Sequence, residues 1–212
     1  MKYALDPNIE HYCERLSQEE PHYLKALVYD TERQSQYSQM LSGPLIGQLL
    51  QTLIRLCQAR TVLEIGTFTG YGTLSMAEAL PEVGHIITCD VNQTTSAIAA
   101  KHIAESPHAD KITLKIQPAL EVIKDHAEDS FDVIFVDADK EHYPDYFSEG
   151  FKRLKNHGFM AFDNALFFGQ VLQPHNKQSA AIHKTNELIK AHPQACNVLL
   201  PICDGLHLVQ KK

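Results

Sequence analysis

From residue 61 onward, short apolar runs alternate with amphipathic stretches. Five of the runs are rich in β-branched and aromatic residues, which favours strands: 61–65, 85–90, 111–116, 131–137 and 159–164. Between them, three stretches have apolar residues near helical spacing: 94–105, 119–127 and 145–154. Because strands alternate with helices and one strand is almost continuously apolar, the pattern predicts an α/β fold with a mostly parallel sheet and helices on both faces.

The two ends of the chain follow other patterns. Near the C-terminus, the runs 197–202 and 206–210 are joined by a Cys-Asp-Gly turn, which predicts an antiparallel hairpin at one edge of the sheet. Before residue 60 the pattern is helical, most clearly over 47–59. No repeat, low-complexity tract or linker interrupts the sequence. We therefore expect a single domain over 1–212, with an N-terminal helical segment (1–60) and an α/β core (61–212).

The composition narrows the class of protein. The chain has 212 residues, of which 44% are hydrophobic and 21% charged, as in a soluble globular protein with one sizeable core. Its formal net charge of −7 argues against a nucleic-acid partner. Five widely spaced cysteines without a C-x-x-C pair favour free thiols over disulfides or a zinc site. The sequence shows neither a signal peptide nor a membrane-spanning run, so we expect a cytoplasmic protein.

A glycine-punctuated turn follows the first predicted strand. In "VLEIGTFTGYGTL" (62–74), Gly66 and Gly70 let the backbone turn tightly and approach a ligand, and the N-terminus of the next helix points into the same crevice. The spacing is G-x-x-x-G rather than the G-x-G-x-x-G of dinucleotide-binding proteins. This difference weakens an interpretation as a pyrophosphate site.

Two acids accompany this turn. Glu64, before Gly66, would repel a pyrophosphate but would suit a cationic ligand. Asp90 ends the second strand, where a carboxylate can accept hydrogen bonds from ribose hydroxyls. A positively charged nucleoside such as S-adenosylmethionine fits both acids. In the structural alternative, the glycines only shape a turn and Asp90 only caps a helix.

Further polar residues stand at the ends of two neighbouring predicted strands. Asp137 ends the fourth strand, and Asp163 and Asn164 end the fifth. Because neighbouring parallel strands lie about 4.8 Å apart, these oxygens can converge on one point. Two carboxylates and an amide oxygen suit Mg²⁺, Mn²⁺ or Ca²⁺ rather than zinc or copper. Helix capping explains one such residue easily, but not three at the same edge.

Lys140 comes three residues after Asp137. Near a divalent cation an ammonium group loses its proton more readily, and a neutral lysine can act as a general base. Without these neighbours, Lys140 would be interpreted as a solvated loop residue.

Several motifs together resemble the cation-dependent class I O-methyltransferases, the caffeoyl-CoA and catechol O-methyltransferase group. They are "LEIGTFTGYGTL", "TCDVN", "FDVIFVDADKEHYPDYF", "GFMAFDNALFFGQV" and "LPICDGLHLV", and the resemblance covers about residues 38–212. It implies a Rossmann-like seven-stranded methyltransferase sheet with an antiparallel C-terminal hairpin. It also implies S-adenosyl-L-methionine and a divalent cation as cofactors, and commonly a homodimer.

The resemblance assigns roles to single residues. Asp137, Asp163 and Asn164 match the family's metal ligands, and Lys140 matches the lysine assigned as catalytic base in the catechol branch. The expected cofactor-binding residues, taken from the glycine turn and the resemblance together, are Met40, Ser42, Glu64, Gly66, Thr67, Gly70, Gly72, Asp90, Ala119 and Asp139.

Two positions depart from the plant caffeoyl-CoA enzymes. Gly72 stands where those enzymes have a cofactor-binding serine, so one hydrogen bond is expected to be missing or to come from the backbone. Phe168 stands where they have a substrate-contacting asparagine, which indicates a more apolar pocket wall and leaves the acceptor open.

The resemblance implies an S-adenosylmethionine- and metal-dependent O-methyltransferase that acts on a hydroxyl of a small catechol-like or phenolic acceptor. The metal would lower the pKa of the reacting hydroxyl, and Lys140 would take its proton before attack on the cofactor methyl group. Three alternatives remain: a methyltransferase of a hydroxylated tRNA nucleoside, a nicotinamide-dependent oxidoreductase, and a cofactor-binding module without catalysis. The acidic charge disfavours the first, and the glycine spacing disfavours the second.

Overall fold

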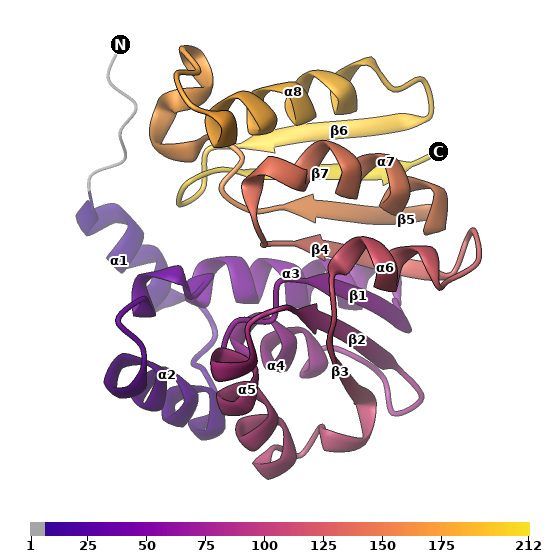
Figure 1. The fold of residues 1–212 in the computed structure, drawn as a ribbon. Coiled ribbons are helices and arrows are strands. Elements are labelled where there is room, and N and C mark those ends of the chain that lie inside the picture. Colours follow the sequence, from indigo (N-terminus) through magenta and orange to yellow (C-terminus); the bar gives the residue numbers. More distant parts are fainter. Residues whose placement is uncertain (1–6) are drawn as a thin grey trace.

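The computed structural model describes residues 7–212, and a seven-stranded sheet forms its centre (Figure 1). The strands lie in the order β3-β2-β1-β4-β5-β7-β6. They are β1 (Thr61–Ile65), β2 (His85–Asp90), β3 (Ile112–Ile116), β4 (Phe131–Val136), β5 (Leu154–Phe162), β6 (Ala195–Leu200) and β7 (Leu206–Lys211). Strands β1 to β5 pair in parallel, whereas β7 runs antiparallel to both β5 and β6. The predicted sheet and its C-terminal hairpin are therefore confirmed.

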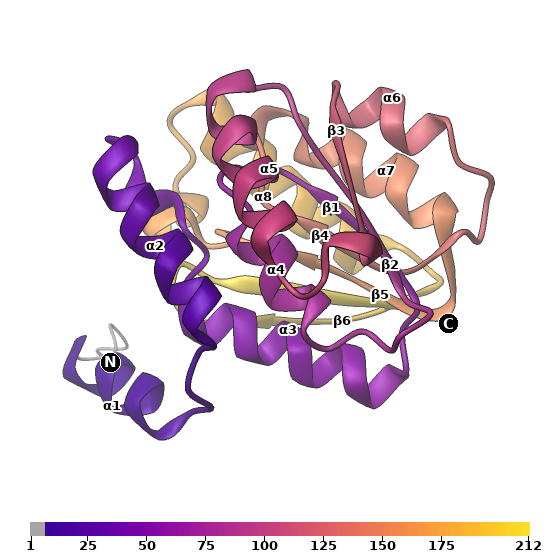
Figure 2. The same cartoon turned by 90° about the horizontal axis from the view of Figure 1, so that it is seen from below.

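Helices cover both faces of the sheet. One face carries α6 (Ala119–Lys124), α7 (Tyr143–Arg153) and α8 (Lys177–Ala191). The other carries α3 (Gly43–Cys57), α4 (Tyr71–Ala77) and α5 (Gln93–Glu105). Figure 2 shows the N-terminal helices α1 (Pro7–Leu16) and α2 (His22–Gln34) at the outside of this second layer. Short 3-10 helices complete the chain: η1 (Ser38–Met40), η2 (Ala109–Lys111), η3 (Lys140–His142) and η4 (Phe167–Leu172).

Strand β4 shows how the sheet is held between these layers. Ile134 and Val136 are buried in the core with α6, α7 and α8, and Val133 and Phe135 are buried in the core with α3 and α4. Successive side chains point to opposite faces of a strand, so a continuous apolar run buries both faces. Burying one side chain of this size contributes about 1.5–3 kcal/mol relative to leaving it exposed. The end of β4 is therefore fixed in space, and so are the polar residues that follow it.

Strand β5 is longer than the sequence pattern predicts. It begins at Leu154 rather than at 159, because residues 155–157 are polar and interrupt the apolar pattern. The hairpin strand β6 likewise spans 195–200 instead of the predicted 197–202. Strand β5 also ends at Phe162 rather than at the predicted 164, so Asp163 and Asn164 directly follow the strand.

The N-terminal helices bring a further segment to the sheet. Helix α2 packs through Leu24 and Leu27 against Tyr71 and Leu74 of α4 and Ala99 of α5. The chain after α2 then passes the carboxyl ends of the parallel strands before α3 begins. In the part of the chain that the structure describes, no helix has the length and apolar character needed to cross a membrane.

Candidate active site

A cavity of about 760 Å³ lies at the carboxyl ends of β1, β2, β4 and β5. Its wall also includes the segment between α2 and α3 and the turn between β6 and β7. Most of the site residues predicted from the sequence line this one cavity: Met40, Ser42, Gly66, Asp90, Ala119, Asp137, Asp139, Lys140, Asp163, Asn164 and Phe168. The fold therefore brings together residues as far apart in the sequence as Met40 and Phe168.

The glycine turn after β1 forms one wall. Gly66 has φ +101°, and a Cβ added there would lie 2.0 Å from the backbone oxygen of Asp137. Only glycine allows β1 and β4 to approach so closely at this point. Beside the turn, the Asp90 carboxylate accepts hydrogen bonds from the backbone N–H groups of Phe68 (2.8 Å) and Asn92 (2.9 Å). These bonds orient the carboxylate at the cavity wall.

Glu64 lies behind this wall rather than in it. Its side chain is 1% exposed, and it accepts hydrogen bonds from the hydroxyls of Thr88 (2.6 Å) and Thr73. Burial raises the pKa of the Glu64 carboxyl to about 8, although the two hydroxyl hydrogen bonds oppose this effect. Glycine at position 72 makes room for the carboxyl, because a Cβ there would lie 2.4 Å from Glu64 Oε1.

Thr67, Gly70 and Gly72 also lie outside the cavity wall. The Thr67 hydroxyl lies 2.6 Å from that of Thr88, and Gly70, with φ +94°, forms the N-cap of α4. These residues, together with Glu64, shape the layer beneath the glycine turn. Their direct contact with a cofactor stays a prediction.

The predicted metal ligands come together at two neighbouring strand ends. Val136 pairs with Phe162 in the sheet, so Asp137 and Asp163 follow at the same edge. Asp163 is 4% exposed, and its pKa is raised to about 7, first by burial and then by the negative charge of Asp137. Asn164 follows with φ +54°, in the left-handed backbone region that residues other than glycine rarely adopt.

Two further observations bear on whether this group fits a cation. Within residues 7–212, no three His, Cys, Asp or Glu side chains are arranged to hold a metal ion. The predicted set has two carboxylates, and its third ligand is an amide. Asp204 adds a carboxyl to the same cavity, and its Oδ2 is buried without a hydrogen-bond partner among the described residues. Crowded, buried carboxylate oxygens are what a hard divalent cation binds, so these residues fit such an ion.

Lys140 begins η3, directly beyond the end of β4. Its Nζ donates hydrogen bonds to Asp137 Oδ1 (3.0 Å) and to the hydroxyl oxygen of Tyr143 (2.6 Å). The other Asp137 oxygen, Oδ2, accepts a hydrogen bond from the Ser42 hydroxyl (3.2 Å). The predicted base and a predicted metal ligand are therefore in direct contact.

Asp139 is held on both of its oxygens. Oδ1 accepts a hydrogen bond from the Tyr146 hydroxyl, and Oδ2 contacts Nδ1 of His142. The same contact raises the pKa of His142, so that the imidazolium form is favoured beside this carboxylate. The carboxylate thus lies in a fixed orientation at the cavity wall.

Comparison with known proteins now decides the family. A family model described as O-methyltransferase matches residues 14–212. The chain belongs to this family. The resemblance inferred from the motifs, to the S-adenosylmethionine-dependent O-methyltransferases of the caffeoyl-CoA and catechol group, is thereby confirmed, and the chain is an enzyme of this class.

Individual relatives agree with this assignment. The chain is 36% identical over 171 residues to catechol O-methyltransferase domain-containing protein 1 of Mus musculus; the match covers 78% of this chain but 65% of the mouse protein, less than two thirds of its length. It is 34% identical over 177 residues to caffeoyl-CoA O-methyltransferase 1 of Eucalyptus globulus, with 78% and 72% covered. The O-methyltransferase TomG of Streptomyces achromogenes, solved with S-adenosylmethionine, superimposes with a TM-score of 0.86 at 27% identity, with 97% and 96% covered.

In this O-methyltransferase, Phe168 stands at the cavity mouth. It is 80% exposed, and both Phe168 (φ +53°) and its neighbour Phe167 (φ +45°) have left-handed backbone conformations. Such conformations are strained for aromatic residues and persist where surrounding contacts impose them. The backbone N–H of Phe168 donates to Asp204 Oδ1, which ties this strained loop to the β6–β7 turn.

Three residues of the site have no role assigned from the sequence, although all three stand within the motifs that carry the family resemblance. Tyr143 and Tyr146 lie just before and within a stretch that the pattern predicts only as a helix, and they are three residues apart, so they share one side of that helix. The pattern places Asp204 only in a turn. Because β7 runs antiparallel to β5, the residues before it lie beside the end of β5, and only this topology brings Asp204 to the cavity.

Proposed function

We propose that this O-methyltransferase uses S-adenosylmethionine and a divalent cation to methylate one hydroxyl of a small catechol-like acceptor. The observation that carries the proposal is the convergence of Asp137, Asp163, Asn164 and Lys140 on the cavity that Asp90 also lines. The proposed cofactor site, the proposed metal site and the proposed base therefore all face the same cavity.

The residues proposed to bind the cofactor form the cavity wall at the carboxyl ends of β1 and β2. Asp90 is oriented by two backbone donors, and its carboxylate can accept further hydrogen bonds from ribose hydroxyls. Gly66 lets the glycine turn pack directly against the Asp137 backbone at the cavity wall, and Asp139 adds negative charge that suits a sulfonium and an ammonium group. The solved TomG structure, which contains S-adenosylmethionine, supports the same cofactor.

The catalytic half rests on Asp137, Asp163, Asn164 and Lys140. These oxygens would hold Mg²⁺, Mn²⁺ or Ca²⁺, and a bound divalent cation supplies a Lewis acid that lowers the pKa of an acceptor hydroxyl. Lys140 Nζ lies next to this point and takes the proton of the reacting hydroxyl. The cavity walls align the acceptor oxygen with the cofactor methyl group, and this orientation provides much of the rate.

The charge of the cavity favours an acceptor without phosphate groups. Its described wall has five carboxyl groups (Asp90, Asp137, Asp139, Asp163 and Asp204) and a single cationic side chain, Lys140. An acceptor carrying several phosphates, such as a coenzyme A thioester or a tRNA, lacks basic partners there. The exposed ring of Phe168 offers an aromatic acceptor a flat apolar surface instead.

An acceptor panel tests this proposal. The purified enzyme is incubated with methyl-labelled S-adenosylmethionine and Mg²⁺, and with catechol, phenol, a caffeoyl-CoA thioester or unmodified and hydroxylated tRNA. We expect label in catechol, much less in phenol, which lacks the second oxygen, and little in the phosphate-bearing acceptors. Faster transfer to the thioester or to tRNA than to any small catechol would contradict the proposed acceptor.

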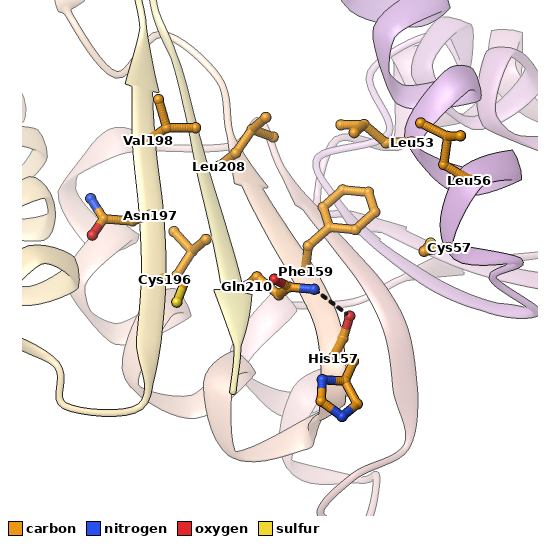
Figure 3. Close-up of a pocket in the computed structure, with 11 residues that line it drawn as sticks. Leu53, Leu56, Cys57, His157, Phe159, Cys196, Asn197, Val198, Leu208 and Gln210 are labelled. Atoms are coloured by element: carbon orange, nitrogen blue, oxygen red, sulfur yellow. Dashed lines mark hydrogen bonds between the residues drawn. The ribbon is translucent and has the colours of Figure 1, made fainter.

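We also propose that the enzyme is a homodimer, which contacts its second copy through an apolar hollow remote from the strand ends. This hollow of about 650 Å³ lies between α3 and the open face of β5, β7 and β6 (Figure 3). Leu56 on α3 and Val198 on β6 lie at opposite sides of the hollow and are 76% and 48% exposed, and exposed large apolar side chains around one surface are typical of a protein contact. At one end of the hollow, Gln210 Nε2 donates a hydrogen bond of 3.2 Å to the backbone oxygen of His157.

Sedimentation velocity tests the dimer. Leu56→Glu should shift the protein to a monomer, whereas Val83→Glu, which changes an equally exposed residue (76%) outside the hollow, should not. A wild-type protein that sediments as a monomer at all concentrations would reject the proposal.

A cytoplasmic location stays a prediction of the sequence.

A further inference from the structure

The hydroxyl of Tyr143 occupies the point where the two ligand-bearing strand ends meet. Tyr143 is the first residue of α7 and is 1% exposed. Its hydroxyl oxygen lies 2.6 Å from Lys140 Nζ, 3.0 Å from the backbone oxygen of Asp163 and 3.3 Å from that of Val136. One buried side chain therefore contacts the ends of β4 and β5 and the proposed base.

The chemistry of these partners fixes the role of the hydroxyl. A phenol has a single proton to donate, and backbone oxygens can only accept. The closer carbonyl, that of Asp163, therefore receives the proton, and a lone pair of the Tyr143 oxygen faces Lys140. The hydroxyl is oriented by the backbone, so it offers Lys140 an acceptor whose position does not depend on the lysine itself.

Lys140 has a second partner whose role is already assigned. Its Nζ donates to Asp137 Oδ1, and Asp137 is a proposed metal ligand. A carboxylate that binds a cation is a weaker partner for an ammonium group, because the cation repels the ammonium. Tyr143 carries no such charge, and its ring also lies beneath Lys140, with Nζ 4.8 Å from the ring centroid.

We propose that Tyr143 is a positioning residue for Lys140. The Tyr143 hydroxyl holds Lys140 Nζ at the carboxyl ends of β4 and β5, where Nζ can take the proton of the acceptor hydroxyl. The inference rests on the proposed function of Lys140 as the base. A lysine side chain has four flexible torsions, and fixing its end in one place reduces the ordering needed during each turnover. The competing explanation is that the Tyr143 hydroxyl only fastens β4 to β5.

A double-mutant cycle on single-turnover methyl transfer separates these explanations. Tyr143→Phe removes the hydroxyl and keeps the ring, which packs 5.6 Å from Phe162 between centroids. We expect a loss of about 10–100-fold, the usual effect of removing a group that orients a functional residue, with little change in the KM for S-adenosylmethionine. In a Lys140→Met background, the same substitution should change the rate less than about twofold.

The outcomes are distinct. An equal loss from Tyr143→Phe in both backgrounds would overturn the inference and show a role in fastening the strands. If Lys140→Met itself retains wild-type rates, the assignment of the base fails, and the positioning role falls with it. Unchanged rates in Tyr143→Phe would also overturn the positioning role while leaving Lys140 as the base.

A second variant covers the case in which Tyr143→Phe does not fold. Replacing Tyr143 with 4-aminophenylalanine keeps an N–H donor for the Asp163 carbonyl but provides a poor acceptor for Lys140. A fastening role predicts wild-type rates for this protein, whereas the positioning role predicts the same loss as with phenylalanine. Thermal midpoints and S-adenosylhomocysteine affinity, measured on each variant, should stay close to wild type.

Discussion

At the scale of single residues, Gly72 shows how an absent side chain can support a site. The sequence marks it as an expected cofactor-binding position and as a departure from a serine. In the structure, Glu64 Oε1 fills the space a Cβ would occupy, and the Thr73 hydroxyl of the next residue donates to the same carboxyl. Thr73 is fully buried, so this hydroxyl fixes Glu64 rather than a ligand in the cavity. This arrangement could not be predicted from the motif, because it depends on the rotamer of a buried acid.

Gly72→Ala should destabilise the enzyme by about 1–3 kcal/mol, because the methyl group displaces the Glu64 carboxyl from its buried hydroxyl partners. Urea unfolding measures the loss. In a Glu64→Ala background the space is free, so the same substitution should cost little. If Gly72→Ala destabilises both backgrounds equally, the cause is not the crowding of Glu64.

At the scale of secondary-structure elements, a buried polar network joins the β6–β7 hairpin to the loop after β5, which carries the proposed metal ligand Asn164. His207 on β7 is 2% exposed; its Nδ1 lies 2.8 Å from Asn186 Oδ1 and its Nε2 lies 2.9 Å from Asn197 Nδ2. Asn186, on α8, also donates to the backbone oxygen of Ala165 (2.9 Å), next to Asn164. A neutral imidazole with one donor and one acceptor nitrogen satisfies both amides.

This network predicts sensitivity to acid. Burial lowers the pKa of His207 to about 4. Below the usual pKa of about 6.5, the unfolded chain binds a proton that the folded chain does not, so stability falls as the pH drops from about 6.5 towards 4. The full effect of this pKa difference on the free energy of unfolding is about 3 kcal/mol. The free energy of unfolding of wild type should therefore decrease more between about pH 7 and 4.5 than that of His207→Gln. Parallel curves for the two proteins would contradict this explanation.

The same elements show what a sequence pattern can and cannot predict. Strand ends are predictable where apolar runs stop at polar residues, so the sequence alone places Asp137, Asp163 and Asn164 at one edge of the sheet, and the strand pairing confirms it. Asp204 is not predictable in this way, because its place depends on how the hairpin folds back along β5. Nor can the pattern show that Glu64 turns behind the glycine turn rather than into the cavity, since both orientations leave the strand unchanged.

At the scale of the whole molecule, the mostly parallel sheet and both helical layers follow from the alternation of strands and helices along the chain, whereas the order of the strands does not. The family assignment rests on the order of the motifs along nearly the whole chain, and the family model confirms it over residues 14–212. The proposed contact between copies could not be predicted from the sequence pattern, because it involves exposed side chains such as Leu56 rather than the core.

The central claim is that methyl transfer needs a divalent cation held by Asp137, Asp163 and Asn164. The most direct measurement is transfer of a labelled methyl group from S-adenosylmethionine to catechol, before and after removal of metals with excess chelator. We predict that chelation abolishes transfer, that Mg²⁺, Mn²⁺ or Ca²⁺ restores it, and that Asp163→Asn is not restored. Full activity in excess chelator, with no bound metal detected in the protein, would contradict the claim.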